Sequence, residues 1–540
     1  MSAAAGAFGA VAGSEPGAGV GGLPEGWYRV SREPCQCRDA RAAGFWHCRW
    51  GPAAPGGASG DPPALKRRAA GSDNDGVNRP PARIPPPKVV PLTDVHAALS
   101  FALDLTEGQP MGHSLRTCLI CMDVAERLDL PLQVRRDLYY AALLKDTGCS
   151  SNAAAVYEMF GGDEIAAKRA RMVTDWSNEL SAVLFALRHA APGASWGERV
   201  RRMATLAQLG SGVASKLVRV RCDRGAEIVL QLGFGSGAAE AVRALEEHWD
   251  GHGHPAGLKG DQIPIVARVL GLAQILEVFA SENGPAAGLA RVRRRSGRWF
   301  DPTVVEACRG LEPKLAHWAT RGTHELRADV SAAEPGHAAL LAGSATLQRV
   351  AHVFADIVDA KSPYTGAHSQ RVAELSVGVA RTLGWNRELV EETRSAALLH
   401  DLGKLSVPNR ILDKPGPLDA AEWEIMRLHA LYTERILEHV QGFEWLAFAS
   451  AAHHERMDGS GYCRGIAADQ LPELSRVLAV ADVFDALSTA RPYRHALEPD
   501  QVLAIMEDEG AAGFCPECFD ALRCNVEEGG AESASDTRAA

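Results

Sequence analysis

The residue types best suited to metal chemistry are gathered in the C-terminal half of the chain. There an adjacent His and Asp follow an apolar run, residues 396–399, that is typical of a buried helix. A buried imidazole beside a buried carboxylate is costly unless both have partners, and a divalent metal ion is the usual partner. The members of this candidate set are His368, His400, Asp401, His429, His453, His454 and Asp482.

The donor types narrow both the metal and the reaction. Imidazole and carboxylate ligands without cysteine suit iron, manganese, cobalt, nickel or zinc, and the lack of thiolates argues against a structural zinc site. With one central carboxylate, two metal ions roughly 3.5–4 Å apart and bridged by Asp401 are the economical arrangement. Such a pair lowers the pKa of a bridging water and stabilises both oxygens of an in-line displacement at phosphorus. The set therefore predicts phosphoester hydrolysis.

Helices must position these side chains, and the surrounding sequence has helical periodicity. After His368 the apolar residues recur at three- and four-residue spacing through Val379. His429 lies in a predicted helix, residues 420–439, that opens with a capping-box pattern at Asp419. A single histidine on an apolar helix face is more often a core residue than a ligand, but that interpretation is implausible for the whole set at once.

Length and composition describe an ordinary globular protein. The chain has 540 residues, a formal charge of −10, 46% hydrophobic and 23% charged residues, so we expect two to four domains and no nucleic-acid partner. No apolar run approaches the roughly 20 residues of a membrane span, and the N-terminus lacks the basic region of a signal peptide. We therefore expect a cytoplasmic location without membrane contact. The 12 cysteines fit reduced thiols.

Comparison of the chain with itself reveals a duplication. Two pairs of matching segments share an offset of 255 residues, and two further pairs share an offset of 208. Because two constant offsets are hard to obtain by accident, we infer two copies of one helical unit. The difference of 47 residues predicts an insertion in the first copy between residues 150 and 225. The matching segments are 112–116 with 367–371, 141–146 with 396–401, 250–254 with 458–462, and 268–274 with 476–482.

The two copies differ where the chemistry would lie. Only His113 and Asp146 remain as candidate ligands in the first copy. Since two ligands do not hold a dinuclear centre, the first copy should keep the fold and lose the metals. The replacements are Lys145 for His400, Cys149 for Lys404, Cys222 for His429, Leu245 and Glu246 for His453 and His454, and Gln274 for Asp482.

The composition along the chain sets the expected domain boundaries. We expect a disordered, low-complexity segment at 1–88, a first helical domain at 89–319, a linker at 320–344, a second helical domain at 345–524 and a disordered tail at 525–540. Cysteines at positions 35, 37 and 48 match no common zinc module. The CxxC at 515–518 is better explained by Pro516 in the first turn of a helix.

Four motifs follow one another in the second copy: His400-Asp401-x-x-Lys404, His453-His454-Glu455, Asp458-Gly459-x-Gly461-Tyr462 and Arg491-Pro492-Tyr493-Arg494. With these motifs in family order, the second copy resembles the HD-GYP domain, a branch of the HD phosphohydrolase superfamily. The resemblance covers residues 345–524 and implies an all-α protein of two tandem HD-type domains, the first one degenerate. It also implies a metal-dependent phosphodiesterase that opens cyclic di-GMP, by a metal-bridging hydroxide, to a linear dinucleotide or GMP.

The same resemblance implies roles for single residues. Asp401 and Lys404 would be catalytic, with Lys404 neutralising the scissile phosphate. Tyr462, Tyr493 and Arg494 would contact the substrate. Two divalent metals, with iron or manganese expected, would be held by His368, His400, Asp401 and Asp482 on one side and by Asp401, His429, His453 and His454 on the other.

Two positions depart from the family pattern. Cys463 replaces the proline that closes the GYP motif, a change expected to affect loop order or partner contacts more than metal binding. Tyr364 stands where some family members have a Glu that supports a third metal, so we expect two metals.

Two rival functions remain at this point. One is an HD phosphohydrolase acting on another nucleotide, which Tyr462 and the motif of residues 491–494 disfavour. The other is a non-catalytic protein that senses a nucleotide or binds a partner, which the complete ligand set disfavours. The expected partner is a cyclic dinucleotide. The sequence leaves open the metal, the final product, the input signal, the role of the first copy, and a homodimer or signalling-protein partner.

Overall fold

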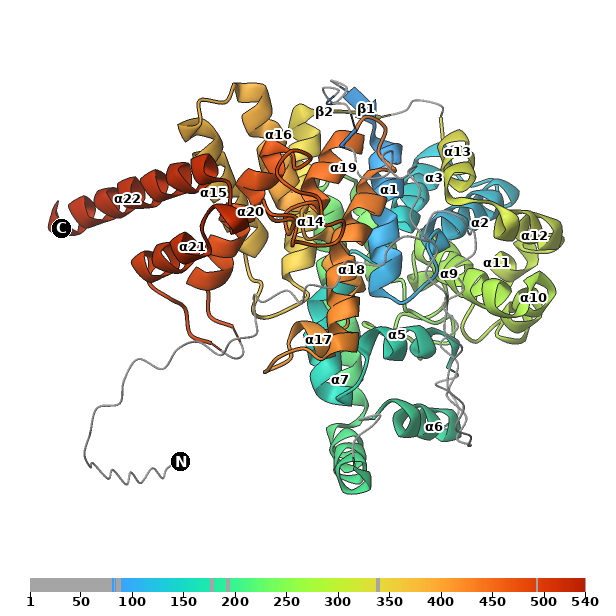
Figure 1. Ribbon diagram of the computed structural model, residues 1–540. Helices are drawn as coiled ribbons and strands as arrows, with labels where there is room; N and C mark the ends of the chain where they lie inside the picture. Colours follow the sequence, from blue (N-terminus) through green and yellow to red (C-terminus); the bar gives the residue numbers. More distant parts are fainter. Residues whose placement is uncertain are drawn as a thin grey trace, which may run out of the picture. The chain divides into compact units, whose positions relative to one another are not determined.

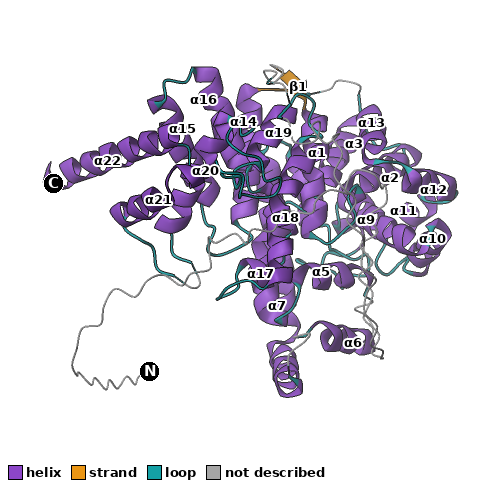
Figure 2. Ribbon diagram, in the orientation of Figure 1, coloured by secondary structure: helices purple, strands orange, loops and turns teal. Residues whose placement is uncertain are grey.

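The computed structural model describes residues 80, 81, 83, 89–174, 179–190, 195–336, 340–491 and 494–539. Within these residues the chain is almost entirely helical (Figure 1, Figure 2), which confirms the all-α prediction. The predicted disordered segment 1–88 falls outside the described residues except for positions 80, 81 and 83. No helix in the described part of the chain is long and apolar enough to cross a membrane.

The first copy is a succession of helices with two short 3-10 segments, η2 and η3. Its elements are α1 (Leu92–Thr106), α2 (His113–Arg127), α3 (Leu132–Leu144), η2 (Cys149–Asn152), α4 (Ala153–Phe160), α5 (Glu164–Val173), α6 (Glu179–His189), α7 (Trp196–Gln231), α8 (Ser236–Arg243), η3 (Gly260–Gln262), α9 (Ile265–Asn283), α10 (Pro285–Arg294), α11 (Pro302–Ala307) and α12 (Glu312–Thr320).

The second copy repeats the same plan with fewer elements. Its elements are α14 (Ser344–Asp359), α15 (His368–Thr382), α16 (Arg387–Leu399), η4 (Leu402–Ser406), α17 (Asn409–Leu412), α18 (Ala420–Leu437), α19 (Glu444–Ala451), α20 (Glu473–Ser488), α21 (Pro499–Gly513) and α22 (Pro516–Ala539).

The duplication found in the sequence reappears in the helix bounds. α2 and α15 each have 15 residues and begin at histidines 255 positions apart, and α3 and α16 each have 13 residues at the same offset. The predicted insertion between residues 150 and 225 contains α4, α5, α6 and much of α7. At the corresponding place the second copy has the one-turn α17, its flanking loops and the first part of α18.

Equivalent elements of the two copies pack on each other reciprocally. α1 packs against η4 and α18 of the second copy, and α14 packs against η2 of the first. Strands β1 (Val89–Pro91) and β2 (Leu341–Gly343), which directly precede α1 and α14, pair antiparallel with Val90 opposite Ala342. This exchange of equivalent contacts is the arrangement of a two-fold dimer, here formed within one chain.

The two copies share one apolar core. Phe101 of α1 and Phe354 of α14 are both fully buried and belong to the same cluster, together with Leu143 and Leu398 at the ends of α3 and α16. Full burial of such side chains contributes about 1.5–3 kcal/mol each. The segment that ends in the adjacent His and Asp is therefore anchored by the core.

Two segments differ from the sequence-based expectation. Within the predicted linker, 320–344, the chain forms α13 (Thr323–Ala332) as well as β2. α13 forms because Leu326 and Val330, four residues apart, are buried against α1 and α2. The segment 525–540 was predicted to be disordered, but α22 continues through it as far as Ala539.

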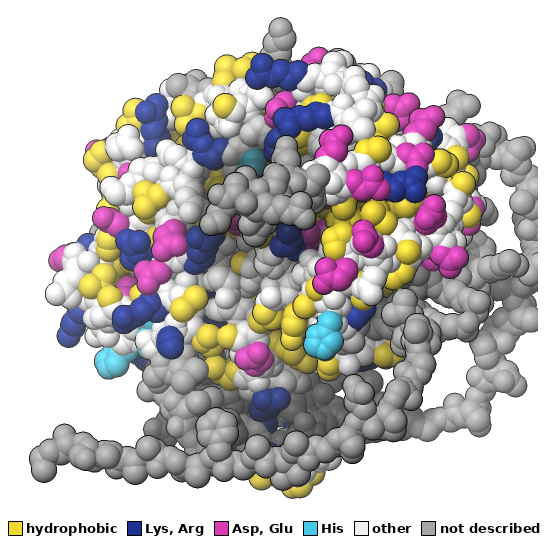
Figure 3. Space-filling model, turned by 90° about the vertical axis from the view of Figure 1, so that its left-hand side faces the viewer, with side chains coloured by type: hydrophobic (Ala, Val, Ile, Leu, Met, Phe, Trp, Pro, Cys, Tyr) yellow, Lys and Arg dark blue, Asp and Glu magenta, His cyan; other side chains and the backbone are white. Residues whose placement is uncertain are grey.

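The surface carries charges of both signs. Figure 3 shows Lys and Arg side chains lying among Asp and Glu side chains over the face that it displays. This interspersed pattern differs from the basic stripe that a nucleic-acid-binding face presents.

Candidate active site

His368 is oriented by a carboxylate on another helix. It is the first residue of α15, and its Nδ1–H donates a hydrogen bond to Oδ2 of Asp485 on α20 at 2.6 Å. Arg371 Nε donates to the other oxygen of Asp485 at 2.5 Å, so the carboxylate itself is fixed. The opposite ring nitrogen, Nε2, then lies 3.2 Å from Asp482 Oδ1 and 3.4 Å from Asp401 Oδ2.

His400 and Asp401 stand where α16 ends and η4 begins. His400 Nδ1–H donates to the Ala397 carbonyl at 2.6 Å, and its Nε2 lies 3.2 Å from Asp401 Oδ2. Asp401 is 1% exposed, and Lys404 Nζ, one turn further on, donates to its Oδ2 at 2.5 Å. The apolar end of α16 thus places an imidazole and a carboxylate side by side in the protein interior.

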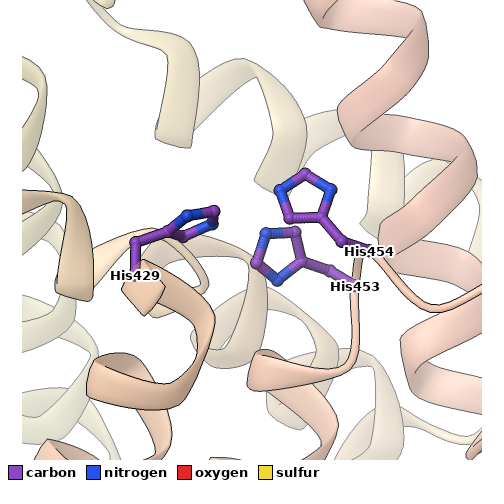
Figure 4. A group of neighbouring side chains, drawn as sticks. All are labelled: His429, His453 and His454. Atoms are coloured by element: carbon purple, nitrogen blue, oxygen red, sulfur yellow. The ribbon is translucent and has the colours of Figure 1, made fainter. Parts of the chain in front are cut away.

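Two more histidines face Asp401 from the other side, and a third, His454, faces Asp482. His429, on α18, and His453, just after α19, donate from Nδ1 to the carbonyls of Met426 and Ser450 at 2.7 and 2.6 Å. Their Nε2 atoms lie 3.5 and 3.8 Å from Asp401 Oδ1. His454 completes the group, and Figure 4 shows its ring beside those of His429 and His453.

Unsatisfied buried atoms test whether this set fits metal ions. Among the described residues, none hydrogen-bonds to the Nε2 atoms of His368, His400, His429 and His453, or to Oδ1 of Asp401. A histidine held through Nδ1 with Nε2 pointing at other donors is the usual orientation of a metal ligand. Ligand atoms within 4.8 Å of one another form the groups His368, His400 and Asp482; His429, His453 and His454; and His400, Asp401 and His453. The donor set fits divalent metal ions.

Protonation of the metal-free group is mixed. Burial lowers the pKa of His400, but the Asp401 and Asp482 carboxylates outweigh it and raise this pKa to about 9. Burial also lowers the pKa of His368, but the carboxylates around it raise this pKa well above the usual value. Binding of a metal ion would displace both protons.

Burial lowers the pKa of His429 to about 4 and that of His454 to about 3, so both rings are neutral at pH 7. Burial alone would raise the pKa of Asp401, but His400 and Lys404 outweigh it and hold this pKa well below its usual range. Neutral imidazoles and ionised carboxylates are the forms that bind metals.

The loop that carries Tyr462 is tied to the centre by Glu455. The buried Glu455 carboxylate accepts hydrogen bonds from the backbone N–H groups of Arg464 at 2.6 Å and Ile466 at 3.2 Å. At Gly461 a Cβ would lie 2.4 Å from the Glu455 Cα, so only glycine fits there. The Tyr462 ring stacks on that of His454 with centroids 4.6 Å apart. Tyr462 therefore lies directly beside the metal-ligand set.

The other predicted substrate contacts have different positions. The guanidinium of Arg494 donates to carbonyls at the end of α20, including Leu487 at 2.8 Å and Ala486 at 2.9 Å. In this structure Arg494 therefore caps a helix, and its contact with substrate stays a prediction. Tyr493 lies outside the described residues. Cys463, at the position of the motif proline, is buried.

Sequence reasoning missed the role of Asp485. The duplication contained a signal for this role, because an acidic residue, Glu277, stands 208 positions before Asp485 in the first copy. In the structure Glu277 hydrogen-bonds to His113 and Arg116. Thr433 was missed as well. Its hydroxyl donates to the His400 carbonyl and accepts the Gly403 N–H, both at 2.9 Å, which fixes the turn between α16 and η4.

The first copy has side-chain cations at positions where the second copy has candidate metal ligands. Lys145 occupies the position of His400, is buried, and pairs with Asp146. Glu246, which matches His454, pairs with Arg171 and Arg221. A protonated lysine in the place of His400 has no lone pair to offer a metal ion. These pairs give a physical reason for the predicted loss of metals from the first copy.

Replacing Asp485 should loosen the metal-ligand set without removing a ligand. An Asp485→Asn variant keeps the shape but loses the charge that orients His368, and such outer partners are typically worth 10- to 100-fold in metal affinity. Competition with a chelator measures the change. The matched control is Glu277→Gln in the first copy, which should retain wild-type metal affinity. Equal affinity in Asp485→Asn and wild type would contradict the orienting role.

The buried histidines and aspartates around Asp401 fit the chemistry of metal-dependent phosphohydrolases, and the family and relatives that match this chain show that it belongs to this class of enzymes. The HD domain family matches residues 208–304 and 352–516 of this chain. With its His-Asp pair and its Gly-Tyr loop motif, the chain belongs to the HD-GYP branch of that family.

Relatives with assigned activities are similar to this chain over different lengths. The 3′3′-cGAMP-specific phosphodiesterase 3 of Vibrio cholerae is 41% identical over 433 residues, which is 80% of this chain and 94% of that protein. The cyclic di-GMP phosphodiesterase response regulator RpfG of Xanthomonas campestris is 37% identical over 179 residues, 33% of this chain and 46% of that protein. The crystal structure of V-cGAP3, a cyclic GMP-AMP specific phosphodiesterase of V. cholerae, matches with a TM-score of 0.57 at 38% identity, covering 81% of this chain and 97% of that one.

Proposed function

We propose that this chain hydrolyses 3′3′-cGAMP to a linear dinucleotide. One observation carries the proposal: the similarity to the 3′3′-cGAMP-specific enzyme extends over 433 residues and so includes both copies. Relatives named for cyclic di-GMP match over 160 to 189 residues. The expected substrate is thereby revised from cyclic di-GMP to a mixed purine dinucleotide, within the same class of cyclic dinucleotide phosphodiesterases.

Cyclic di-GMP is the second candidate. It is favoured by the 37% identity to RpfG over 179 residues, a length close to that of the second copy, which contains the candidate metal ligands. The chemistry at the phosphodiester is the same for both substrates. The two proposals differ only in how a base is recognised.

The donor set supports a centre of two divalent ions, with iron or manganese expected. His368, His400, Asp401 and Asp482 would hold one ion, and Asp401, His429, His453 and His454 the other. When bound, the metals would activate water for attack at phosphorus and stabilise the charge of the displacement.

Two side chains of the candidate centre are partly exposed to solvent, and substrate would approach from their side. Most of the candidate ligands are buried, but the side chains of Lys404 and His454 are 15% and 22% exposed. A phosphodiester approaching there meets the Lys404 ammonium, which lies 2.5 Å from Asp401 Oδ2. A fixed cation in a largely buried site stabilises developing negative charge on phosphate oxygens. Tyr462, stacked on His454, adds an aromatic surface at the same opening.

Competition among substrates tests the proposal. Metal-loaded protein is incubated with equal concentrations of 3′3′-cGAMP, cyclic di-GMP and cyclic di-AMP, and the products are separated by chromatography. We expect 3′3′-cGAMP to be consumed first, with a linear dinucleotide appearing. Faster loss of cyclic di-GMP would favour the second candidate. Absence of any linear product from a metal-loaded protein would contradict both.

A further inference from the structure

Glu164 of the first copy is buried among residues of the second. It is the first residue of α5, within the insertion, and its side chain is fully buried. Its carboxylate accepts the backbone N–H of Asn409, 3.0 Å from each oxygen, and a hydrogen bond from Lys361 Nζ at 3.3 Å. The Lys361 side chain is 1% exposed. The pair is therefore a desolvated contact between segments about 200 residues apart in sequence.

Both partners of Glu164 belong to segments that deliver active-site residues. Lys361 lies in the loop between α14 and α15, seven residues before His368. Asn409 begins α17, directly after the segment η4 that contains Lys404. The two segments are also joined to each other, because Asn409 Nδ2 donates to the Lys361 carbonyl at 2.8 Å. The Glu164 carboxylate thus holds the loop that precedes His368, a candidate metal ligand, and the loop that follows Lys404, the candidate phosphate-binding lysine.

Helix α5 also contacts residues of the first copy at the positions that correspond to the candidate centre, Cys149 and Glu246. Lys168 and Arg171 follow Glu164 by four and seven residues and so lie on one face of α5. Lys168 Nζ donates to the Cys149 carbonyl at 2.5 Å, and Arg171 pairs with Glu246 at 3.0 Å. Through these contacts α5, which Figure 1 labels, links Cys149 and Glu246 of the first copy to the loops of the second copy.

We propose that Glu164 is a positioning residue for the phosphodiesterase centre, acting through Lys361 and Asn409 on the segments that carry His368 and Lys404. This inference rests on the proposed function, and it gives the metal-free first copy a task in catalysis. A buried charge pair with hydrogen bonds on both sides admits few geometries, because any other arrangement leaves a charge unpaired.

Double variants separate this role from simple loss of stability. Glu164→Leu with Lys361→Met leaves no unpaired buried charge but removes the acceptor for the Asn409 N–H. Glu164→Gln with Lys361→Met also leaves no charge, and it keeps a carbonyl acceptor at that place. Asp163→Ala is the control for the helix itself, since Asp163 caps α5 by accepting the Ala166 N–H at 3.0 Å.

Two readouts are taken on the full-length protein: amide hydrogen exchange over residues 402–413, and kcat with KM for the cyclic dinucleotide. For the Leu/Met protein we expect faster exchange at Asn409 and a kcat about 10- to 100-fold lower, the usual effect of a misplacement near 1 Å, with KM changed much less. The Gln/Met protein, which keeps an acceptor for Asn409 but loses the Lys361 contact, should lose less kcat than the Leu/Met protein, and Asp163→Ala should keep near-wild-type kcat.

Wild-type exchange and kcat in the Leu/Met protein would overturn the proposal. So would equal losses in all three variants, because these would follow helix stability and not the Asn409 contact. Hydrogen exchange needs no turnover, so the contact is tested even where the proposed substrate fails. A wild-type protein that hydrolyses no cyclic dinucleotide contradicts the proposed function alone.

Discussion

An Asp401→Asn protein is expected to lose its metal and its activity together. Asp401 lies between the two histidine groups, with one carboxylate oxygen toward each. Its Oδ2 lies 3.2 Å from His400 Nε2 and its Oδ1 lies 3.5 Å from His429 Nε2. An amide has no charge and presents a donor where a ligand is needed. Since bound metals are worth several kcal/mol and each 1.36 kcal/mol is tenfold in rate, kcat should fall at least about 10³-fold.

The matched control for this variant lies in the other copy. Asp146 occupies the equivalent position beside Lys145, so Asp146→Asn should leave both the metal content and the kcat of the folded protein near wild type. Metal analysis and turnover on the same preparations give both numbers. Full metal occupancy in Asp401→Asn, or loss of metal in Asp146→Asn, would show that the centre has been placed wrongly.

The second large effect is expected at Lys404, and it should separate catalysis from metal binding. Lys404→Met keeps every candidate metal ligand but removes the ammonium beside Asp401 at the open side of the centre. Removing one such electrostatic contact typically lowers kcat about 10²- to 10³-fold. Metal content should stay at the wild-type value, because lysine is not among the donors. Steady-state kinetics and metal analysis together measure the two effects.

A second lysine of the same copy serves as the comparison. Lys414 pairs with Glu422 at 2.5 Å and is 32% exposed. Lys414→Met should therefore change kcat little. If Lys404→Met and Lys414→Met had the same kcat, Lys404 would have no part in the reaction.

The sequence predicted the helices that occur in both copies. Two constant offsets gave the duplication, and the helices starting at His113 and His368 bear it out. The strands at 89–91 and 341–343 were not predicted, because three residues carry too little periodicity to be recognised before their pairing is known. Helix α13 was not predicted for a similar reason, because only Leu326 and Val330 mark its buried face.

The grouping of the candidate metal ligands could be predicted for a different reason. One buried histidine or aspartate can be an ordinary core residue, but seven of them in partly apolar helical segments are unlike a normal core. The structure brings all seven side chains together. What the sequence did not reveal are their supports. Asp485 acts on a residue 117 positions away, and Glu164 contacts one 245 positions away. Such pairings depend on the tertiary packing, which local sequence spacing does not specify.

The most direct test of the account is the metal content of the wild-type protein purified without oxygen, compared with that of a His429→Ala variant. We predict about two equivalents of iron or manganese per wild-type chain, and loss of metal together with cyclic dinucleotide hydrolysis in the variant. Four equivalents would place a centre in the first copy as well. No bound metal in an active wild-type protein, or full activity in His429→Ala, would contradict the metal-dependent centre in the second copy.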